Sequence, residues 1–330
     1  MRPSFAVSCT ALICAFVGFA PRAGAAQPEP PALAGGARPG FHALGSKPTV
    51  NKRPGWLSQR AIVSKQLIYV ADGFANQVLI YPTGDPNPSP IGALTYGVSE
   101  PEGMWVDGSG DVFVANTGNN TVEAFRHNQT TPYLVINQAS PGHDYGDTVD
   151  VVADRYGNIW VSGLNGIVTE YAFGTTTPDY SITSGFNQTI AMTFDQLGFL
   201  YVTNITPFNT PGQIFQLGPG WLSGPVLPIS FPSARIGGVL FDKHNNMYVA
   251  DPTDSVIQIY AHGSNVPTST ITNGLLHPVF MAFDKNYNLY VQDYYNNNVT
   301  VYAYGGTSPI ATISNGLMSC YGVAVWSDKY

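Results

Sequence analysis

Charged side chains are scarce in this chain: they make up 11% of the 330 residues, against 44% that are hydrophobic. The few charges are also unevenly divided. Residues 66–330 hold 20 acidic and 6 basic side chains, a net charge of −14, whereas residues 27–65 carry a net charge of +5. Nucleic-acid binding needs clustered cations that neutralise phosphates. The acidic main part of the chain therefore argues against a nucleic-acid ligand.

Long apolar runs are also missing, which excludes an ordinary transmembrane helix of about 20 residues. The longest run, residues 5–20, follows Arg2 and precedes the small residues Ala23-Gly24-Ala25. A positive start, a short apolar stretch and a small-residue cleavage site are typical of a signal peptide. We therefore expect residues 1–25 to be removed and the protein to be secreted or periplasmic.

Cysteine is nearly absent. Cys9 and Cys14 lie in the signal peptide, so Cys320 remains by itself after cleavage. No intramolecular disulfide can then form, and the fold must depend on packing. A single cysteine at the start of an apolar strand is typical of a small buried side chain rather than a nucleophile.

Residues 26–63 contain many Pro, Gly and basic residues and show no helix or strand period. Such a composition is typical of a linker. From residue 64 onward the pattern changes to a repeat, which we interpret as one domain covering residues 64–330.

The clearest mark of the repeat is an aromatic residue followed by Val. The six pairs are spaced by 44, 47, 41, 47 and 42 residues: Tyr69-Val70, Phe113-Val114, Trp160-Val161, Tyr201-Val202, Tyr248-Val249 and Tyr290-Val291. A period in the forties with several short strands per unit is typical of a β-propeller blade. The sequence therefore predicts a six-bladed propeller of four-stranded antiparallel blades.

Each unit has the same internal order. An apolar strand ends in Asp107, Asp154, Asp195, Asp242 or Asp284, and a tight turn follows. Asp at the head of such a turn accepts backbone N–H bonds. Next comes the aromatic-Val strand, with an Asp or Asn three residues past the aromatic in five units and Gly163 in the third. A third strand that ends in an aromatic residue in five units follows, and then a short fourth strand. The apolar strands show little alternation, which favours burial on both faces.

The two ends of the repeat complement each other. The first aromatic-Val strand, at residues 66–70, has no apolar strand before it, and the segment Gly322-Val323-Ala324-Val325 is such a strand with no blade after it. We therefore expect the C-terminal strand to complete the first blade and close the ring, which removes exposed sheet edges.

The unit resembles the NHL-repeat and YVTN-type propeller families. The sequence contains Tyr201-Val202-Thr203-Asn204, and Asn76-Gln77-Val78 matches the Asn-x-Val step of NHL blades. The resemblance covers residues 64–330 and implies the fold, but propellers host unrelated activities.

Among similar propellers are gluconolactonase-like hydrolases, and this resemblance implies a divalent metal held at the channel mouth by residues just before the innermost strands. Pro101-Glu102-Gly103 matches their motif. The equivalent positions of the other units do not: Val149, Ile190, Gly237, Val279 and Tyr321. A single carboxylate cannot make a hard-metal site, which needs several converging oxygens.

One acidic segment leaves a metal site open as an alternative. His143, Asp144, Asp147 and Asp150 lead into the apolar strand of the third unit, and Glu102 enters the second. These groups are candidate ligands for Ca²⁺ or another divalent cation. The other interpretation is a solvated acidic loop with Asx turns.

Three further residues are candidates for ligand binding at the channel mouth: Glu100, Arg235 and Tyr321. Exposed aromatics beside Asn-rich loops, such as Tyr145, Tyr294 and Tyr295, suit protein or sugar surfaces.

Two functions remain. The first, which we favour, is a monomeric, non-enzymatic binding or scaffold module for a protein or glycan partner, with no certain cofactor. The second is a metal-dependent hydrolase or lyase. Carboxylates that converge on the ring axis favour the enzyme, whereas an apolar ring at Val149, Ile190 and Val279 favours the binding module.

Overall fold

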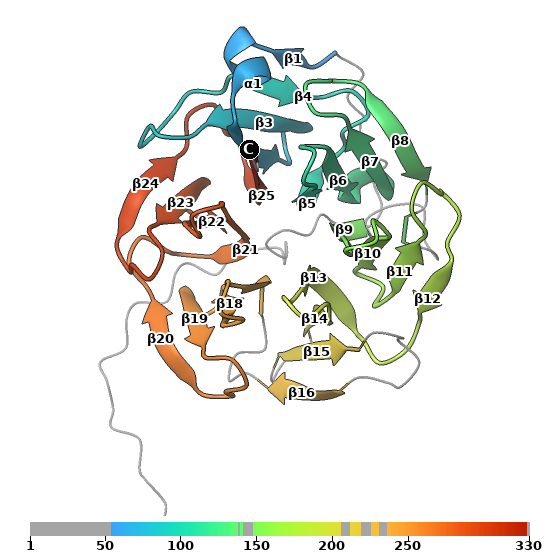
Figure 1. Ribbon diagram of the computed structural model, residues 1–330, viewed down its shortest axis with the longest axis vertical. Coiled ribbons are helices and arrows are strands. Elements are labelled where there is room, and N and C mark those ends of the chain that lie inside the picture. The colour runs from blue at the N-terminus through green and yellow to red at the C-terminus, as the bar shows by residue number, and fades with distance from the viewer. Residues whose placement is uncertain are drawn as a thin grey trace, which may run out of the picture. The chain divides into compact units, whose positions relative to one another are not determined.

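The apolar segments that end in aspartate form the innermost strands of antiparallel sheets. The computed structural model describes residues 54–137, 139–140, 148–205, 212–218, 226–230 and 236–328, all within the unit that runs from Arg38 to Tyr330. Within this unit the sheets stand side by side around a ring (Figure 1). The innermost strands are β5 (Pro101–Val106), β9 (Thr148–Ala153), β13 (Gln188–Phe194), β17 (Val239–Phe241), β21 (Pro278–Phe283) and β25 (Cys320–Ser327).

The aromatic-Val segments form the second strand of each sheet. They are β2 (Gln66–Asp72), β6 (Val112–Asn116), β10 (Ile159–Gly163), β14 (Leu200–Ile205), β18 (Met247–Asp251) and β22 (Leu289–Asp293). The third strands are β3 (Gln77–Pro82), β7 (Thr121–Phe125), β11 (Val168–Tyr171), β15 (Gln213–Leu217), β19 (Val256–Tyr260) and β23 (Asn298–Tyr302). The fourth are β4 (Gly92–Leu94), β8 (Pro132–Asn137), β12 (Tyr180–Ile182), β16 (Val226–Ser230), β20 (Pro267–Ile271) and β24 (Pro309–Ile313). A 3-10 turn, η1 (Thr117–Asn119), follows β6.

The ring closes as the sequence predicts. The C-terminal strand β25 pairs antiparallel with β2, from Gln66 opposite Ser327 to Asp72 opposite Cys320. The first blade therefore combines the first and last strands of the repeat region in the order β4-β3-β2-β25. Six sheets result, and the prediction of a six-bladed propeller is confirmed.

The predicted linker corresponds to structured backbone at its C-terminal end. Residues 56–63 form β1 (Trp56–Leu57) and a short helix α1 (Gln59–Val63), which Ser58 caps by accepting a bond from the Ala61 N–H. β1 adds a fifth strand to the first sheet by pairing with β4. The boundary at residue 63 needs this correction because a two-residue strand and a five-residue helix are too short to produce a sequence period.

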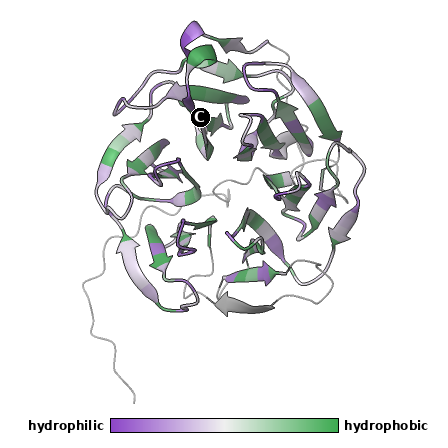
Figure 2. Ribbon diagram, viewed as in Figure 1, coloured by the Kyte–Doolittle hydropathy of each residue, from purple (hydrophilic) through white to green (hydrophobic). Residues whose placement is uncertain are grey.

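Six apolar clusters fill the spaces between successive blades. Alternate residues of β2 illustrate the arrangement: Ile68 and Val70 face the sixth blade, whereas Tyr69 and Ala71 face the second. Because both faces of such a strand are buried, its sequence is continuously apolar. Figure 2 shows hydrophobic residues on the strands of every blade. Cys320, a free cysteine, is buried in the cluster between the first and sixth blades.

The repeated acidic residues hold the turns and loops. The Oδ1 atom of Asp242 accepts bonds from the N–H groups of His244 and Asn246, and four other turn aspartates do the same in their blades. At the opposite end, Asp72 and Asp293 accept N–H bonds from the segments that lead into the innermost strand of their own blade. The repeat motif thus fixes both sets of connections.

Candidate functional site

The six innermost strands surround a channel with two different ends. We call the face where these strands begin the start face, and the face where they end the end face. Because Pro101 at the start of β5 pairs with Asn116 at the end of β6, the loops between second and third strands also lie on the start face. The tight turns headed by aspartate lie on the end face.

Apolar side chains occupy the channel at the start face. Val149, Ile190, Ala191 and Phe280 are buried against one another, and Leu164, Ile205 and Val279 pack on them. We call these seven residues the apolar plug. Val149, Ile190 and Val279 are equivalent in sequence to Glu102, and metal-binding propellers carry ligands at such positions. The structure shows apolar side chains packed together at all three positions.

Glu102, in β5, is buried beside the plug with 3% of its surface exposed. Burial raises the pKa of Glu102 well above its usual range, and the charges of Glu100 and Asp150 raise it further, against a hydrogen bond with Thr117. Burial is the largest of these effects, so the pKa of Glu102 stays raised, and its Oε1 has no partner among the described residues.

Asp150, in β9, is a second buried carboxyl. Its Oδ2 accepts a bond from the Met192 N–H at 2.8 Å, and its Oδ1 one from the Val151 N–H at 2.9 Å. Burial raises the pKa of Asp150 to about 8 despite these two bonds. The pairing of β13 with β14 shifts register between Thr189 and Met192, and the Met192 N–H donates to Asp150 in the neighbouring blade. Such a bulge re-aims backbone groups.

Gly103 explains how the two carboxyls come together. A Cβ at this position would lie 2.1 Å from the Asp150 Oδ1 and 2.7 Å from the Val149 carbonyl oxygen. Any larger residue would therefore push β5 and β9 apart or displace the Asp150 carboxyl. The Pro-Glu-Gly motif pointed to Glu102, but nothing in the sequence indicated that Gly103 contacts Asp150.

The other predicted site residues have different placements. Glu100 lies in the left-handed region with φ of 47°, and its N–H donates to Asn76. His143, Asp144, Tyr145, Asp147 and Arg235 lie outside the described residues. Within the described part of the chain, no group of three His, Cys, Asp or Glu side chains is arranged to hold a metal ion.

A continuous row of rings crosses the start face over the first and sixth blades. Ring centroids are separated by 5.8 Å from Phe74 to Tyr321, 5.3 Å from Tyr321 to Tyr294, 5.4 Å from Tyr294 to Tyr295 and 4.4 Å from Tyr295 to His277. We call these five residues the aromatic row. Tyr294, Tyr295 and Tyr321 were candidates from the sequence. No sequence motif indicates Phe74 or His277.

The buried and exposed ends of the row differ in character. Tyr321 is buried, and burial together with its hydrogen bond to Tyr294 raises its pKa. Phe74 and Tyr295 expose 58% and 47% of their surfaces. Two apolar neighbours in adjacent start-face segments, Leu276 and Met318, are also exposed. The row is therefore anchored by the buried Tyr321, and its exposed rings are accessible to a ligand.

Comparison with solved structures supports the fold. A chain of the nidogen/laminin complex matches with a TM-score of 0.68 and 13% identity, covering 80% of this chain and 100% of the other. A protein of unknown function from Bacteroides caccae matches with a TM-score of 0.64 and 10% identity, over 80% and 99% of the two chains. At these identities the likeness establishes a propeller fold and no more.

No family model matches the chain, and neither does any curated protein. Virginiamycin B lyase from Staphylococcus aureus matches over 62% of this chain with a TM-score of 0.49, too low a similarity to bear on activity. In the described part of the chain, no helix has the length and apolarity needed to cross a membrane.

Proposed function

We propose that this protein is a secreted or periplasmic, non-enzymatic binding module that holds a protein or glycan partner on its start face. The observation that carries this proposal is the aromatic row, with its exposed Phe74 and Tyr295. Aromatic side chains supply large contact areas at low entropic cost in protein interfaces and stack on sugar rings.

The loops that carry these apolar residues are ordered before any partner binds. The Phe74 N–H donates to the Ser319 Oγ at 2.7 Å, and the Leu276 N–H donates to Asp293 at 2.6 Å. Asp72 accepts from the N–H groups of Met318 and Ser319. Binding then costs little loop ordering, which preserves affinity. The nidogen/laminin complex shows that a chain of this fold occurs in a protein–protein complex.

A photo-reactive phenylalanine analogue tests where the partner binds. Phe74 and Phe173 are both exposed, by 58% and 76%, but Phe173 follows β11 on the end face. We expect the analogue at Phe74 to cross-link one defined partner from the extracellular proteins or glycans of the native organism, and the analogue at Phe173 to cross-link none. Equal capture at both positions would contradict a binding site on the start face.

A metal-dependent hydrolase or lyase is the second candidate, favoured by one observation: Glu102 and Asp150 are buried close together. Ca²⁺ takes six to eight oxygen ligands, roughly, and Zn²⁺ takes four in structural sites. Among the described residues no three His, Cys, Asp or Glu side chains converge here, so they do not make a complete divalent site, and no catalytic step follows from them.

The two candidates differ in their response to metals. A ligand at about 100 times its dissociation constant stabilises the folded state by about 2.7 kcal/mol. The binding module predicts the same thermal unfolding midpoint in EDTA as in millimolar Ca²⁺, Mn²⁺ or Zn²⁺. A rise of several degrees that Glu102→Ala abolishes would instead support the enzyme.

A further inference from the structure

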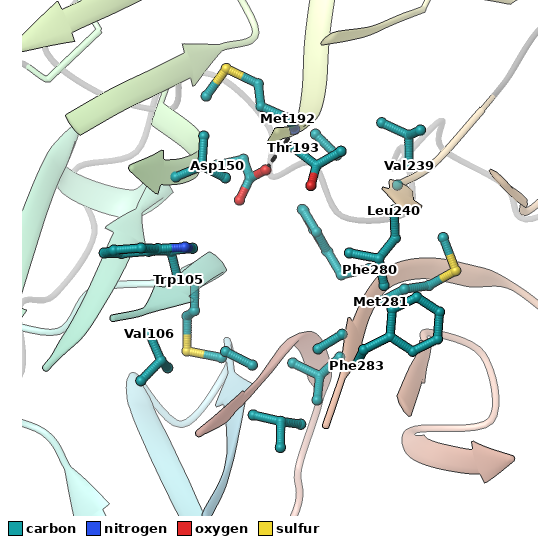
Figure 3. A pocket seen from close by; sticks show the side chains of 18 residues that line it. Trp105, Val106, Asp150, Met192, Thr193, Val239, Leu240, Phe280, Met281 and Phe283 are labelled. Atoms are coloured by element: carbon teal, nitrogen blue, oxygen red, sulfur yellow. Dashed lines mark hydrogen bonds between the residues drawn. The ribbon is translucent and has the colours of Figure 1, made fainter. Parts of the chain in front are cut away.

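Below the apolar plug the channel contains a cavity of about 210 Å³. All six innermost strands line it, mostly with apolar side chains such as Trp105, Met192 and Phe280. Asp150 is the sole titratable residue among those lining it, and its carboxyl points into the cavity (Figure 3). A carboxyl among mostly apolar side chains, with backbone polar groups also facing the cavity, is suited to orient a ligand.

The cavity is closed at one end and reached from the other. At the start face Ala191 and Phe280 belong to the buried plug. Toward the end face the lining residues become partly exposed, as at Val106, Thr193 and Leu240. A ligand would enter from the end face and meet Asp150 at the closed end.

The charges around the open end favour a cation. Five innermost strands run directly into the aspartate-headed turns, and these turns hold six aspartates and three cations: Asp107, Asp111, Asp154, Asp195, Asp242, Asp284, Arg155, Lys243 and Lys285. Arg126 pairs with Asp111 at 2.8 Å, which leaves five aspartates against three cations in these turns. Arg155 donates to the Leu197 carbonyl within the rim, and Lys243 lies 4.6 Å from the Tyr304 ring centroid. A net negative rim raises the local concentration of cations.

We propose that the channel binds a small organic amine with an apolar body, whose ammonium group pairs with Asp150 while Trp105 and Phe280 contact the apolar part. The two N–H bonds from Val151 and Met192 hold the carboxyl in place. Trp105 also supplies a π face for a nearby cation. This site is separate from the aromatic row and does not depend on the proposed function.

The charge state of Asp150 gives the binding a measurable signature. Because its pKa is about 8, the carboxyl is mostly protonated at pH 7 and must release its proton to pair with an ammonium ion. Glu102 also interacts with Asp150, and burial raises its pKa. We expect about one proton to be released per amine bound at pH 7, as linkage requires.

Isothermal titration with phenethylamine, its neutral analogue 2-phenylethanol and the anion phenylacetate tests the proposal. We expect the amine to bind the wild-type protein more tightly than either analogue, with a heat that varies with the ionisation enthalpy of the buffer. Asp150→Asn keeps the shape and should weaken amine binding by about tenfold to a hundredfold, the range for loss of a charged hydrogen bond.

Glu123→Gln is the matched control, because Glu123 is also a buried carboxyl with a pKa of about 8 but does not line the cavity. It should leave amine binding unchanged. Equal binding of the amine and the alcohol by the wild-type protein, or an Asp150→Asn protein that binds the amine as tightly as wild type, would overturn the proposal.

Discussion

Removal of the last strand, β25, is expected to abolish folding of the propeller. A chain that stops at Ser319 lacks the innermost strand of the first blade and leaves one side of β2 unpaired. It also loses the buried side chains of Tyr321, Val323 and Trp326. Full burial of a large apolar side chain contributes about 1.5–3 kcal/mol, so these three contribute about 5–9 kcal/mol. That is comparable to the whole stability of a typical domain, about 5–15 kcal/mol.

Far-ultraviolet circular dichroism with urea unfolding measures this effect. The truncated chain should show no cooperative transition, whereas a chain that stops at Asp328 and keeps all of β25 should unfold like the full-length protein. If the chain ending at Ser319 unfolds cooperatively at the wild-type urea concentration, the ring is not closed by β25.

Alkaline pH is expected to destabilise the protein, because two buried carboxyls must ionise. Burial raises the pKa values of Glu123 and Asp150 to about 8, from reference values of 4.5 and 3.8. A folded-state pKa above the unfolded one means that the folded protein holds the proton more tightly. The associated stability is fully present below about pH 4 and is lost as the pH rises through 8.

The window from pH 7 to pH 9 excludes the groups with lowered pKa values, whereas Glu102 and Cys320, whose pKa values burial raises, add to the loss. The depressed pKa of Asp242 acts at low pH, and the lowered pKa of His127 acts below neutrality. Between pH 7 and pH 9 each buried carboxyl should cost about 1.4 kcal/mol, one pKa unit of interaction. Urea unfolding of the wild-type protein should therefore show a loss of about 2–3 kcal/mol for the two groups together.

Glu123→Gln should remove the part of this dependence that Glu123 contributes. The amide does not ionise, so between pH 7 and pH 9 the variant should lose about 1.4 kcal/mol less stability than wild type. Asp254→Asn, at an exposed position, serves as the control and should follow the wild-type curve. Wild-type stability that is constant from pH 7 to pH 9 would show that these carboxyls are not buried as described.

The fold could be predicted in detail because the residues that define the repeat are those buried in the strands and those that form the turns. Tyr69-Val70 and its five equivalents lie in second strands, and the turn aspartates accept the expected N–H bonds. Each of these features is local or recurs at a fixed spacing. Closure by residues 320–327 was also predictable, since a strand was missing at one end and in excess at the other.

Most of the site could not be predicted, because its residues are far apart in the sequence and come together only when the propeller closes. Phe74 and His277 are 203 positions apart in the sequence yet belong to one row of rings. The approach of Gly103 to Asp150 depends on how closely β5 and β9 pack, which no motif encodes. The Pro-Glu-Gly motif pointed to Glu102, but the rise in its pKa follows from burial, which the sequence does not specify.

The most direct test of the binding proposal is the dissociation constant of the partner captured through Phe74, measured for two matched double variants. Phe74→Ser with Tyr295→Ser removes the exposed rings of the start face, and Tyr156→Ser with Phe173→Ser removes two exposed rings of the end face. The binding proposal predicts that the first pair weakens binding by about a hundredfold or more, as truncation of interface hot spots does, and that the second leaves it unchanged. Unchanged affinity in the start-face pair, or an equal loss in both pairs, would contradict it.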